Sequence, residues 1–206
     1  MNTNRTALVA GATISGLAAG LALARAGREP VLLEPSPAFE PLRGDLALDA
    51  SALAALDELE LAGVRRNVQL AELQILLLDA LGEHRIRYGY AICCAGQDDL
   101  ARLHLVDGNY VAAPLLVDAQ GAGSPVRRSL GINRDPLRRR AVGRVALVGD
   151  GADGIQDAAA LGRALADKPF FLPEALDRYA RTWRAVAPET VSARRRRISL
   201  VPAFAR

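Results

Sequence analysis

The sequence predicts an α/β fold with a mainly parallel sheet, because apolar strands alternate with helical segments along the chain. Residues 6–10 form a short apolar run, residues 15–26 an Ala/Leu-rich helix, and residues 30–34 a second apolar run. This order is typical of two parallel strands joined by a crossover helix. Later apolar runs at residues 115–117 and 145–148 have strand length and would extend the same sheet.

The remaining predicted elements are helices and antiparallel hairpins. Capping residues and apolar residues at helical spacing predict further helices at residues 49–61, 124–130, 156–166 and 173–187. Strand-like runs predict two hairpins, one from residues 72–78 and 84–90 with a turn near Gly82, the other from residues 101–106 and 110–113. The second hairpin contains Asp107-Gly108, a pair suited to a tight primed turn.

Length and composition indicate one compact domain. The chain has 206 residues, of which 50% are hydrophobic and 24% charged. This composition excludes a disordered chain, and two cysteines exclude a small protein held together by disulfides. We expect a single domain over residues 1–206, discontinuous at about 1–68 and 114–206, with residues 69–113 as a small β-rich insertion.

Charge is divided unevenly along the chain. Residues 1–120 hold nine of the 26 basic side chains and 15 of the 23 acidic ones. Arginine runs at residues 138–140 and 194–197 raise the question of a nucleic-acid or anionic membrane surface. Aromatic residues make up 4% of the chain and are not interleaved with these runs, so bases would find few rings to stack on. We therefore expect solvated surface here, and no nucleic-acid partner.

The uncharged stretch at residues 6–24 follows Arg5 and partly resembles a secretory signal peptide. Glycine and hydroxyl residues interrupt it, and it leads directly into the predicted strand at residues 30–34. The strand, turn and helix explain it better, and a membrane helix needs about 20 strongly apolar residues. We expect a cytoplasmic protein with no membrane span.

Cys93 and Cys94 are the two cysteines of the chain, and they are adjacent in a predicted strand. Neighbouring side chains of a strand point to opposite faces, so we expect no disulfide between them. Without a CxxC or a Cys/His spacing we expect no metal site, and a reducing compartment fits best.

A glycine-rich turn follows the first predicted strand. In the dinucleotide-binding pattern GxGxxG, the first glycine makes the turn, the second lets the backbone approach the pyrophosphate, and the third permits close packing of the helix. Gly11, Thr13 and Gly16 occupy these positions. The β-branched side chain of Thr13 crowds the space in which the second glycine would let the backbone approach the pyrophosphate. The pyrophosphate would lie over the helix N-terminus, whose free amides favour negative charge. Glu34, at the end of the second strand, can accept hydrogen bonds from the ribose hydroxyls of an adenosine.

Residues 11–34, GATISGLAAGLALARAGREPVLLE, resemble the opening of flavin-dependent monooxygenases of the para-hydroxybenzoate hydroxylase type, which bind FAD on such a unit. Two further stretches follow in the family's order. Residues 115–132, LLVDAQGAGSPVRRSLGI, resemble the family's L-V-G-A-D-G-x-x-S-x-V-R segment, and residues 143–167 resemble its late G-R-V-x-L-x-G-D-A-A-H motif. The resemblance implies a Rossmann-like FAD-binding domain with three layers and a mainly parallel sheet, and a reduced antiparallel sheet left from the substrate domain.

The resemblance also implies which residues contact the cofactor. Asp150 matches the family's aspartate that holds the ribityl chain, and Arg43 lies in the loop from which relatives often present an arginine. The implied FAD-binding residues are Gly11, Ala12, Thr13, Ile14, Ser15, Gly16, Glu34, Arg43, Gly149 and Asp150. The resemblance assigns no catalytic side chain, because the flavin carries the chemistry.

Three departures from the family pattern affect the predicted binding of FAD and the expected activity. Asp118 stands where the family has glycine, and Gln120 where it has aspartate. The family's loop after Asp150, which leads to the helix facing the flavin, is missing, and so is most of the substrate-covering region. The family must shield its reactive flavin from water. The shortened chain is therefore expected to bind FAD weakly and, when reduced, to release hydrogen peroxide.

Three functions follow as predictions. The leading one is an FAD-binding oxidoreductase resembling NAD(P)H-dependent flavoprotein monooxygenases, with NAD(P)H as electron donor and an aromatic or polyketide-like small molecule as substrate. The second is a truncated, catalytically inactive descendant that binds a nucleotide or a partner protein. The third is a simple NAD-binding reductase, since Glu34 would serve the adenosine of either cofactor.

Overall fold

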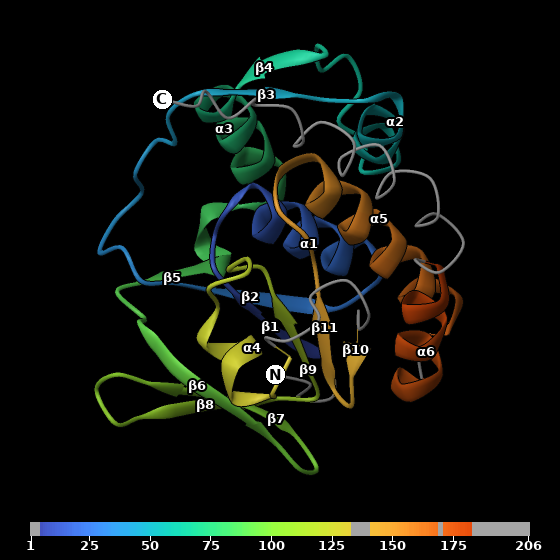
Figure 1. Ribbon diagram of the computed structural model, residues 1–206. Helices are drawn as coiled ribbons and strands as arrows, with labels where there is room; N and C mark the ends of the chain where they lie inside the picture. The colour runs from blue at the N-terminus through green and yellow to red at the C-terminus, as the bar shows by residue number, and fades with distance from the viewer. Residues whose placement is uncertain (1–4, 133–140, 169–170, 183–206) are drawn as a thin grey trace, which may run out of the picture.

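The computed structural model describes residues 5–132, 141–168 and 171–182, and it is organised around a six-stranded sheet (Figure 1). The strand order is β10-β11-β9-β1-β2-β5, and all neighbouring strands are parallel except the antiparallel pair β10–β11. The strands are β1 (Thr6–Ala10), β2 (Glu29–Glu34), β5 (Ile86–Tyr88), β9 (Leu115–Asp118), β10 (Ala141–Val142) and β11 (Val145–Leu147).

Helices cover one face of this sheet. In Figure 1, α1 (Ile14–Arg25), α2 (Ala50–Glu58), α3 (Leu70–Leu81) and α5 (Gly151–Asp167) lie above it, and α6 (Leu172–Thr182) lies beside the β10 edge. The α1 helix packs against both α3 and α5, and α5 also packs against α2 and α6. The contact between α1 and α5 is close, because a Cβ on Gly154 would lie 1.9 Å from Ser15 Oγ.

A smaller antiparallel sheet and a short helix cover the other face. The sheet consists of β6 (Ile92–Gln97), β7 (Ala101–Leu105) and β8 (Tyr110–Ala113), and α4 (Pro125–Ser129) packs against β6. Figure 1 shows the three resulting layers. The predicted α/β fold, with a mainly parallel sheet and a small antiparallel one, is confirmed. A separate two-stranded sheet pairs β3 (Asp45–Ala47) with β4 (Asn67–Gln69).

The central strand β1 contributes to two hydrophobic cores. Ala7 and Val9 belong to the core under the helices, whereas Leu8 and Ala10 belong to the core under the antiparallel sheet. This division follows from the pleat, in which successive side chains point to opposite faces. An uninterrupted apolar strand in the sequence therefore indicates burial on both faces.

The first predicted hairpin is wrong. Residues 70–81 form the helix α3, which buries Leu73, Leu77, Leu78 and Leu81 at helical spacing. The second arm of that hairpin is a strand, but β5 pairs in parallel with β2. The segment 69–113, expected to be a β-rich insertion, thus supplies a helix to the helical layer and a strand to the main sheet, as well as the antiparallel sheet.

The other elements lie close to their predicted positions, with one informative exception. The helix α5 begins at Gly151, not at residue 156, so it starts directly after Asp150. The α6 helix is described as far as Thr182, and the rest of the predicted final helix lies outside the described residues, as do the arginine runs at 138–140 and 194–197. Within the described ranges, no helix combines the length and apolar character that crossing a bilayer requires.

Candidate functional site

The three sequence motifs meet at the carboxyl edge of the parallel sheet. Beyond β1 the chain proceeds to β2 on one side, whereas β9 and β11 lie on the other side, so the order of strands reverses between β1 and β9. In open α/β sheets ligands bind in the crevice at such a reversal. Gly11 follows β1 here, and a Cβ on it would lie 3.1 Å from Cγ of Gln120, which follows β9. A Cβ on Gly121 would lie 2.8 Å from Oδ1 of Asp150, which follows β11.

The glycine turn has the geometry that its spacing predicts. Gly11 has a φ of 93°, in the left-handed region that favours glycine. A Cβ on Gly16 would lie 2.0 Å from the carbonyl oxygen of Gly11, so no side chain fits there. The first and third glycines therefore make the turn and the close packing of α1 on β1.

Thr13, in the place of the second glycine, caps α1. Its hydroxyl oxygen accepts a hydrogen bond from the Gly16 N–H at 3.1 Å and donates one to the carbonyl oxygen of Ala119 at 3.0 Å. The side chain is exposed. Thr13 thus joins the start of α1 to the segment after β9. The Gly16 N–H, one of the amides that a phosphate would use, is already hydrogen-bonded to the Thr13 hydroxyl.

Ile14 and Ser15 support the turn from inside the protein. Both are buried, and Ser15 packs against α5 at Gly154. Neither lines the pocket described below, whereas Ala12 and Thr13 do. The buried side chains of Ile14 and Ser15 therefore belong to the scaffold of the turn.

Glu34 lies at the end of β2 and faces the glycine turn. Its Oε2 accepts a hydrogen bond from the Ala12 N–H at 2.8 Å, and its Oε1 accepts one from the Ser36 N–H at 3.1 Å. A carboxylate offers about four acceptor positions, so this one can take further donors. Two backbone amides fix the carboxylate at the edge of the pocket, where it remains half-buried.

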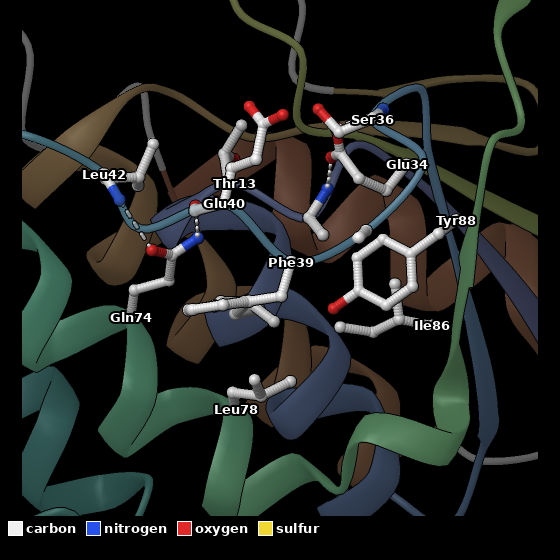
Figure 2. A pocket seen from close by; sticks show the side chains of 13 residues that line it. Thr13, Glu34, Ser36, Phe39, Glu40, Leu42, Gln74, Leu78, Ile86 and Tyr88 are labelled. Carbon is white, nitrogen blue, oxygen red and sulfur yellow. Dashed lines mark hydrogen bonds between the residues drawn. The ribbon is translucent and has the colours of Figure 1, made fainter.

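A pocket of about 140 Å³ opens beside Glu34 (Figure 2). Figure 2 shows Phe39 and Tyr88 on either side of its interior, with Leu78 and Ile86 below them. Sites for whole small molecules usually measure about 300–1,000 Å³. This pocket therefore has room for a group of the size of a nucleobase, and a larger ligand would extend out of it along the glycine turn.

Gln74 holds one wall of this pocket in place. Its Oε1 accepts a hydrogen bond from the Leu42 N–H at 2.9 Å, and its Nε2 donates one to the carbonyl oxygen of Glu40 at 3.2 Å (Figure 2). Gln74 is buried in α3, with 6% of its surface exposed. The helix thus fixes the backbone of the loop after β2, which also carries Phe39.

Tyr88 lies on the other side of the pocket from Gln74 (Figure 2). Its hydroxyl oxygen is buried and has no hydrogen-bond partner within the described residues. Burial raises the pKa of this phenol, and the carboxylates of Glu83 and Glu34 raise it further. The phenol is therefore neutral near pH 7 and can both donate and accept.

The pocket residues after β2 were missed by the sequence analysis. They are Ser36, Ala38, Phe39, Glu40, Leu42, Gln74, Leu78, Ile86 and Tyr88. The spacing of Gln74 and Leu78, four residues apart, was the available signal, since these positions share one face of a helix. This spacing was not used, because residues 72–78 were predicted to form a strand.

The remaining predicted site residues are more exposed. Arg43 is exposed, does not line the pocket and makes no ion pair with another described residue. The Gly149 N–H donates to Oδ2 of Asp157 at 2.7 Å. Asp150 is exposed just before α5, with its carboxylate against Gly121 at the crevice.

The displaced carboxylate of the middle motif lies inside the protein. Asp118 is fully buried at the end of β9, where its Oδ2 accepts from Nε of Arg127 at 3.0 Å and its Oδ1 from the hydroxyl of Ser124 at 2.7 Å. Burial raises the pKa of the Asp118 carboxyl, and these hydrogen bonds and the charge of Arg127 oppose the rise. Arg127 also donates to the carbonyl oxygen of Val148 at 2.7 Å. Nε and Nη2 of the Arg127 guanidinium thus both donate to buried acceptors.

No protein-family model and no curated protein matches this sequence. Solved structures do match. Tetracycline destructase Tet(51) superposes with a TM-score of 0.77 at 14% identity, over 90% of this chain and 88% of that chain. HpxO from Klebsiella pneumoniae, complexed with FAD and uric acid, gives 0.76 at 16% identity, over 95% and 90%. The 2,6-dihydroxypyridine-3-hydroxylase from Arthrobacter nicotinovorans gives 0.69 at 16% identity, over 88% of both chains.

The chain shares the fold of these structures. At sequence identities of 14–16%, this similarity shows a shared fold, and any activity depends on the residues that this chain has at the crevice. Those residues supply backbone amides, an anchored carboxylate, a base-sized pocket and an exposed carboxylate along one crevice. Among the described residues, no group of three or more His, Cys, Asp or Glu side chains is placed to hold a metal ion.

Proposed function

We propose that this chain binds FAD through its adenosine half and acts as the cofactor-binding unit of a monooxygenase-type oxidoreductase. The observation that carries the proposal is the position of Glu34, fixed by two backbone amides between the glycine turn and a base-sized pocket. An acidic side chain at the end of the second strand is suited to bind ribose hydroxyls. The fold shared with HpxO, which was crystallised with FAD, supports the choice of this cofactor.

The residues present fit the ADP part of the cofactor. Phe39, Ile86 and Tyr88 would contact the adenine in the pocket, and Glu34 would accept hydrogen bonds from the ribose. The turn at residues 11–16 and the N-terminus of α1 would hold the pyrophosphate. Asp150 would bind the ribityl chain, in agreement with the resemblance. When bound, the flavin would supply the redox chemistry, and the side chains of this chain would position it.

The electron donor and the substrate class are part of the same proposal. We infer NAD(P)H as donor from the resemblance of the three motifs to NAD(P)H-dependent monooxygenases. We infer an aromatic or polyketide-like substrate from the same resemblance. The matched structures support this substrate class, since they include a complex with uric acid, a dihydroxypyridine hydroxylase and a tetracycline destructase.

One observation favours a second candidate, a nucleotide-binding protein without redox activity. The α5 helix begins directly after Asp150, where the resembled family has a loop leading to the flavin ring. The described pocket has room for a base, which an adenine nucleotide alone would fill. In this candidate the ADP part of the site is kept and the flavin part is lost.

Calorimetric titration with FAD, ADP, FMN and NAD tests these candidates. Since FMN lacks the adenosine, we expect FAD and ADP to bind and FMN not to bind. Binding of FMN without ADP would contradict the adenosine pocket. A visible flavin spectrum that NADH or NADPH bleaches under anaerobic conditions would support the oxidoreductase. Binding of ADP without FAD would support the second candidate, and binding of NAD without FAD would support a simple NAD-binding reductase.

A further inference from the structure

The side chains of Cys93 and Cys94 both project from the outer side of β6. Ile92 and Ala95 are buried, whereas Cys93 is exposed and Cys94 half-buried. In a regular strand the buried residues would lie two apart, not three. Ile92 pairs with Leu105 and Cys94 with His104, so Cys93 is the extra residue of a β-bulge. The expectation that the two side chains point to opposite faces is therefore wrong.

The bulge brings the two sulfur atoms to 3.7 Å from each other. The Cys93 thiol also approaches the carbonyl oxygens of His104, at 3.4 Å, and Leu105, at 3.7 Å. Two thiolates on one tetrahedral centre, with bonds of about 2.3 Å, lie about 3.8 Å apart. The observed separation is close to this distance, so a small rotation of the side chains would let both sulfurs bind one soft atom.

A disulfide and a structural zinc site both fit the geometry of the two cysteines less well. A disulfide usually joins residues whose Cα atoms lie about 4.4–6.8 Å apart, whereas adjacent Cα atoms are about 3.8 Å apart. A structural zinc site needs four ligands. The described residues supply no third His, Cys, Asp or Glu to this pair. A partner that fits the pair is an atom that takes two protein thiols and brings its other substituent with it.

We propose that Cys93 and Cys94 form a two-thiol binding site for monosubstituted trivalent arsenicals. In the reaction with an arsenoxide, two arsenic–sulfur bonds form and the arsenic–oxygen bond breaks. The two thiol protons leave with the oxygen as water, and arsenic remains trivalent. Burial and the neighbouring Cys93 raise the pKa of Cys94, so this thiol brings its proton to the exchange. The site lies on the antiparallel sheet and does not depend on the proposed nucleotide site.

Phenylarsine oxide added to the full chain is the probe. Intact-mass spectrometry should show one phenylarsenic group per chain, which excess glutathione does not remove and 2,3-dimercaptopropanol does. Because the second thiol acts at high effective concentration, Cys93→Ser and Cys94→Ser should each weaken binding about 100-fold. Adduct loss to glutathione from the unsubstituted chain, or an unchanged affinity in either serine variant, would overturn the proposal.

A matched variant tests the spacing instead of the number of thiols. The double substitution Cys93→Ala and Gly96→Cys keeps two cysteines on one face of β6, at a separation of about 6.6 Å along the strand. Position 96 has space for a side chain, since the nearest atom to an added Cβ is His104 Nε2 at 4.0 Å. We expect this variant to bind at least about tenfold more weakly. Equal binding would contradict the role assigned to the bulge.

Discussion

Asp118 and Arg127 form a buried ion pair, with 3.0 Å between Oδ2 and Nε. The pair connects the end of β9 to α4, and through Val148 to the end of β11. It lies beneath the segment that carries Gln120 and Gly121 into the crevice. The carboxylate that the resembled family has in the loop is thus placed in the core of this chain.

Asp118→Asn should destabilise the chain by about 3 kcal/mol, because a buried guanidinium loses its counter-charge. Urea unfolding followed by circular dichroism would measure the change in the free energy of unfolding. Asp98→Asn is the control, since Asp98 pairs with Arg102 on the surface, and its effect should be small by comparison. Equal effects of the two substitutions would show that the buried pair contributes no more than a surface pair.

Glu34→Ala should lower the affinity for ADP and FAD about tenfold or more, because hydrogen bonds to a charged group contribute about 1.5–3 kcal/mol. Titration calorimetry would measure both affinities. Glu29→Ala, at the other end of β2, is the matched control and should leave them unchanged. Retained affinity in Glu34→Ala would remove the ribose contact from the proposed site.

Gln74→Glu should make the pocket wall sensitive to pH. An ionised carboxylate can still accept from the Leu42 N–H, but it would face the carbonyl oxygen of Glu40 without a proton to donate. We expect a loss of about 1–3 kcal/mol of stability above neutral pH, recovered as the introduced carboxyl is protonated at lower pH. Urea unfolding at several pH values would measure this. Gln69→Glu, at an exposed position before α3, should show no such recovery.

Gly154→Ala should be strongly destabilising, by about 3 kcal/mol or more, because the added Cβ would overlap Ser15 Oγ and lie 2.3 Å from the carbonyl oxygen of Gly149. Thermal unfolding would measure the loss. Gly123→Ala is the control, since no atom lies within 4 Å of an added Cβ there and its φ is not positive. A tolerated Gly154→Ala would mean that α1 and α5 can separate at low cost.

The sequence was sufficient for elements set by local signals. The apolar run of β1, the glycine turn and the apolar run of β2 each act within a few residues, and their register follows from the short connection. The β-bulge at Cys93 was not predictable in this way, because it depends on how β6 pairs with β7. The strand predicted in place of α3 failed for a related reason. Its run of apolar residues suits either structure, and packing against α1 decides for the helix.

In the candidate site, too, some residues were predictable from the sequence and others were not. Gly11, Gly16, Glu34 and Asp150 belong to motifs, and the structure places all four along the crevice. The walls of the pocket depend on tertiary contacts. Tyr88 reaches it because β5 pairs with β2, and Phe39 lies in the loop whose backbone Gln74 fixes. Such contacts join residues far apart in the chain, which no local pattern encodes.

The central place of β1 sets an order for folding. It pairs with β2 across a short crossover, but its other neighbour, β9, lies far later in the chain. Closing a longer loop costs more entropy, so the first pairing should form before the second. Pulsed hydrogen exchange during refolding should protect amides of β2 ahead of those of β9, and the reverse order would contradict this. The pocket, whose lining all lies between residues 12 and 88, would then take shape while the crevice beside it is still open.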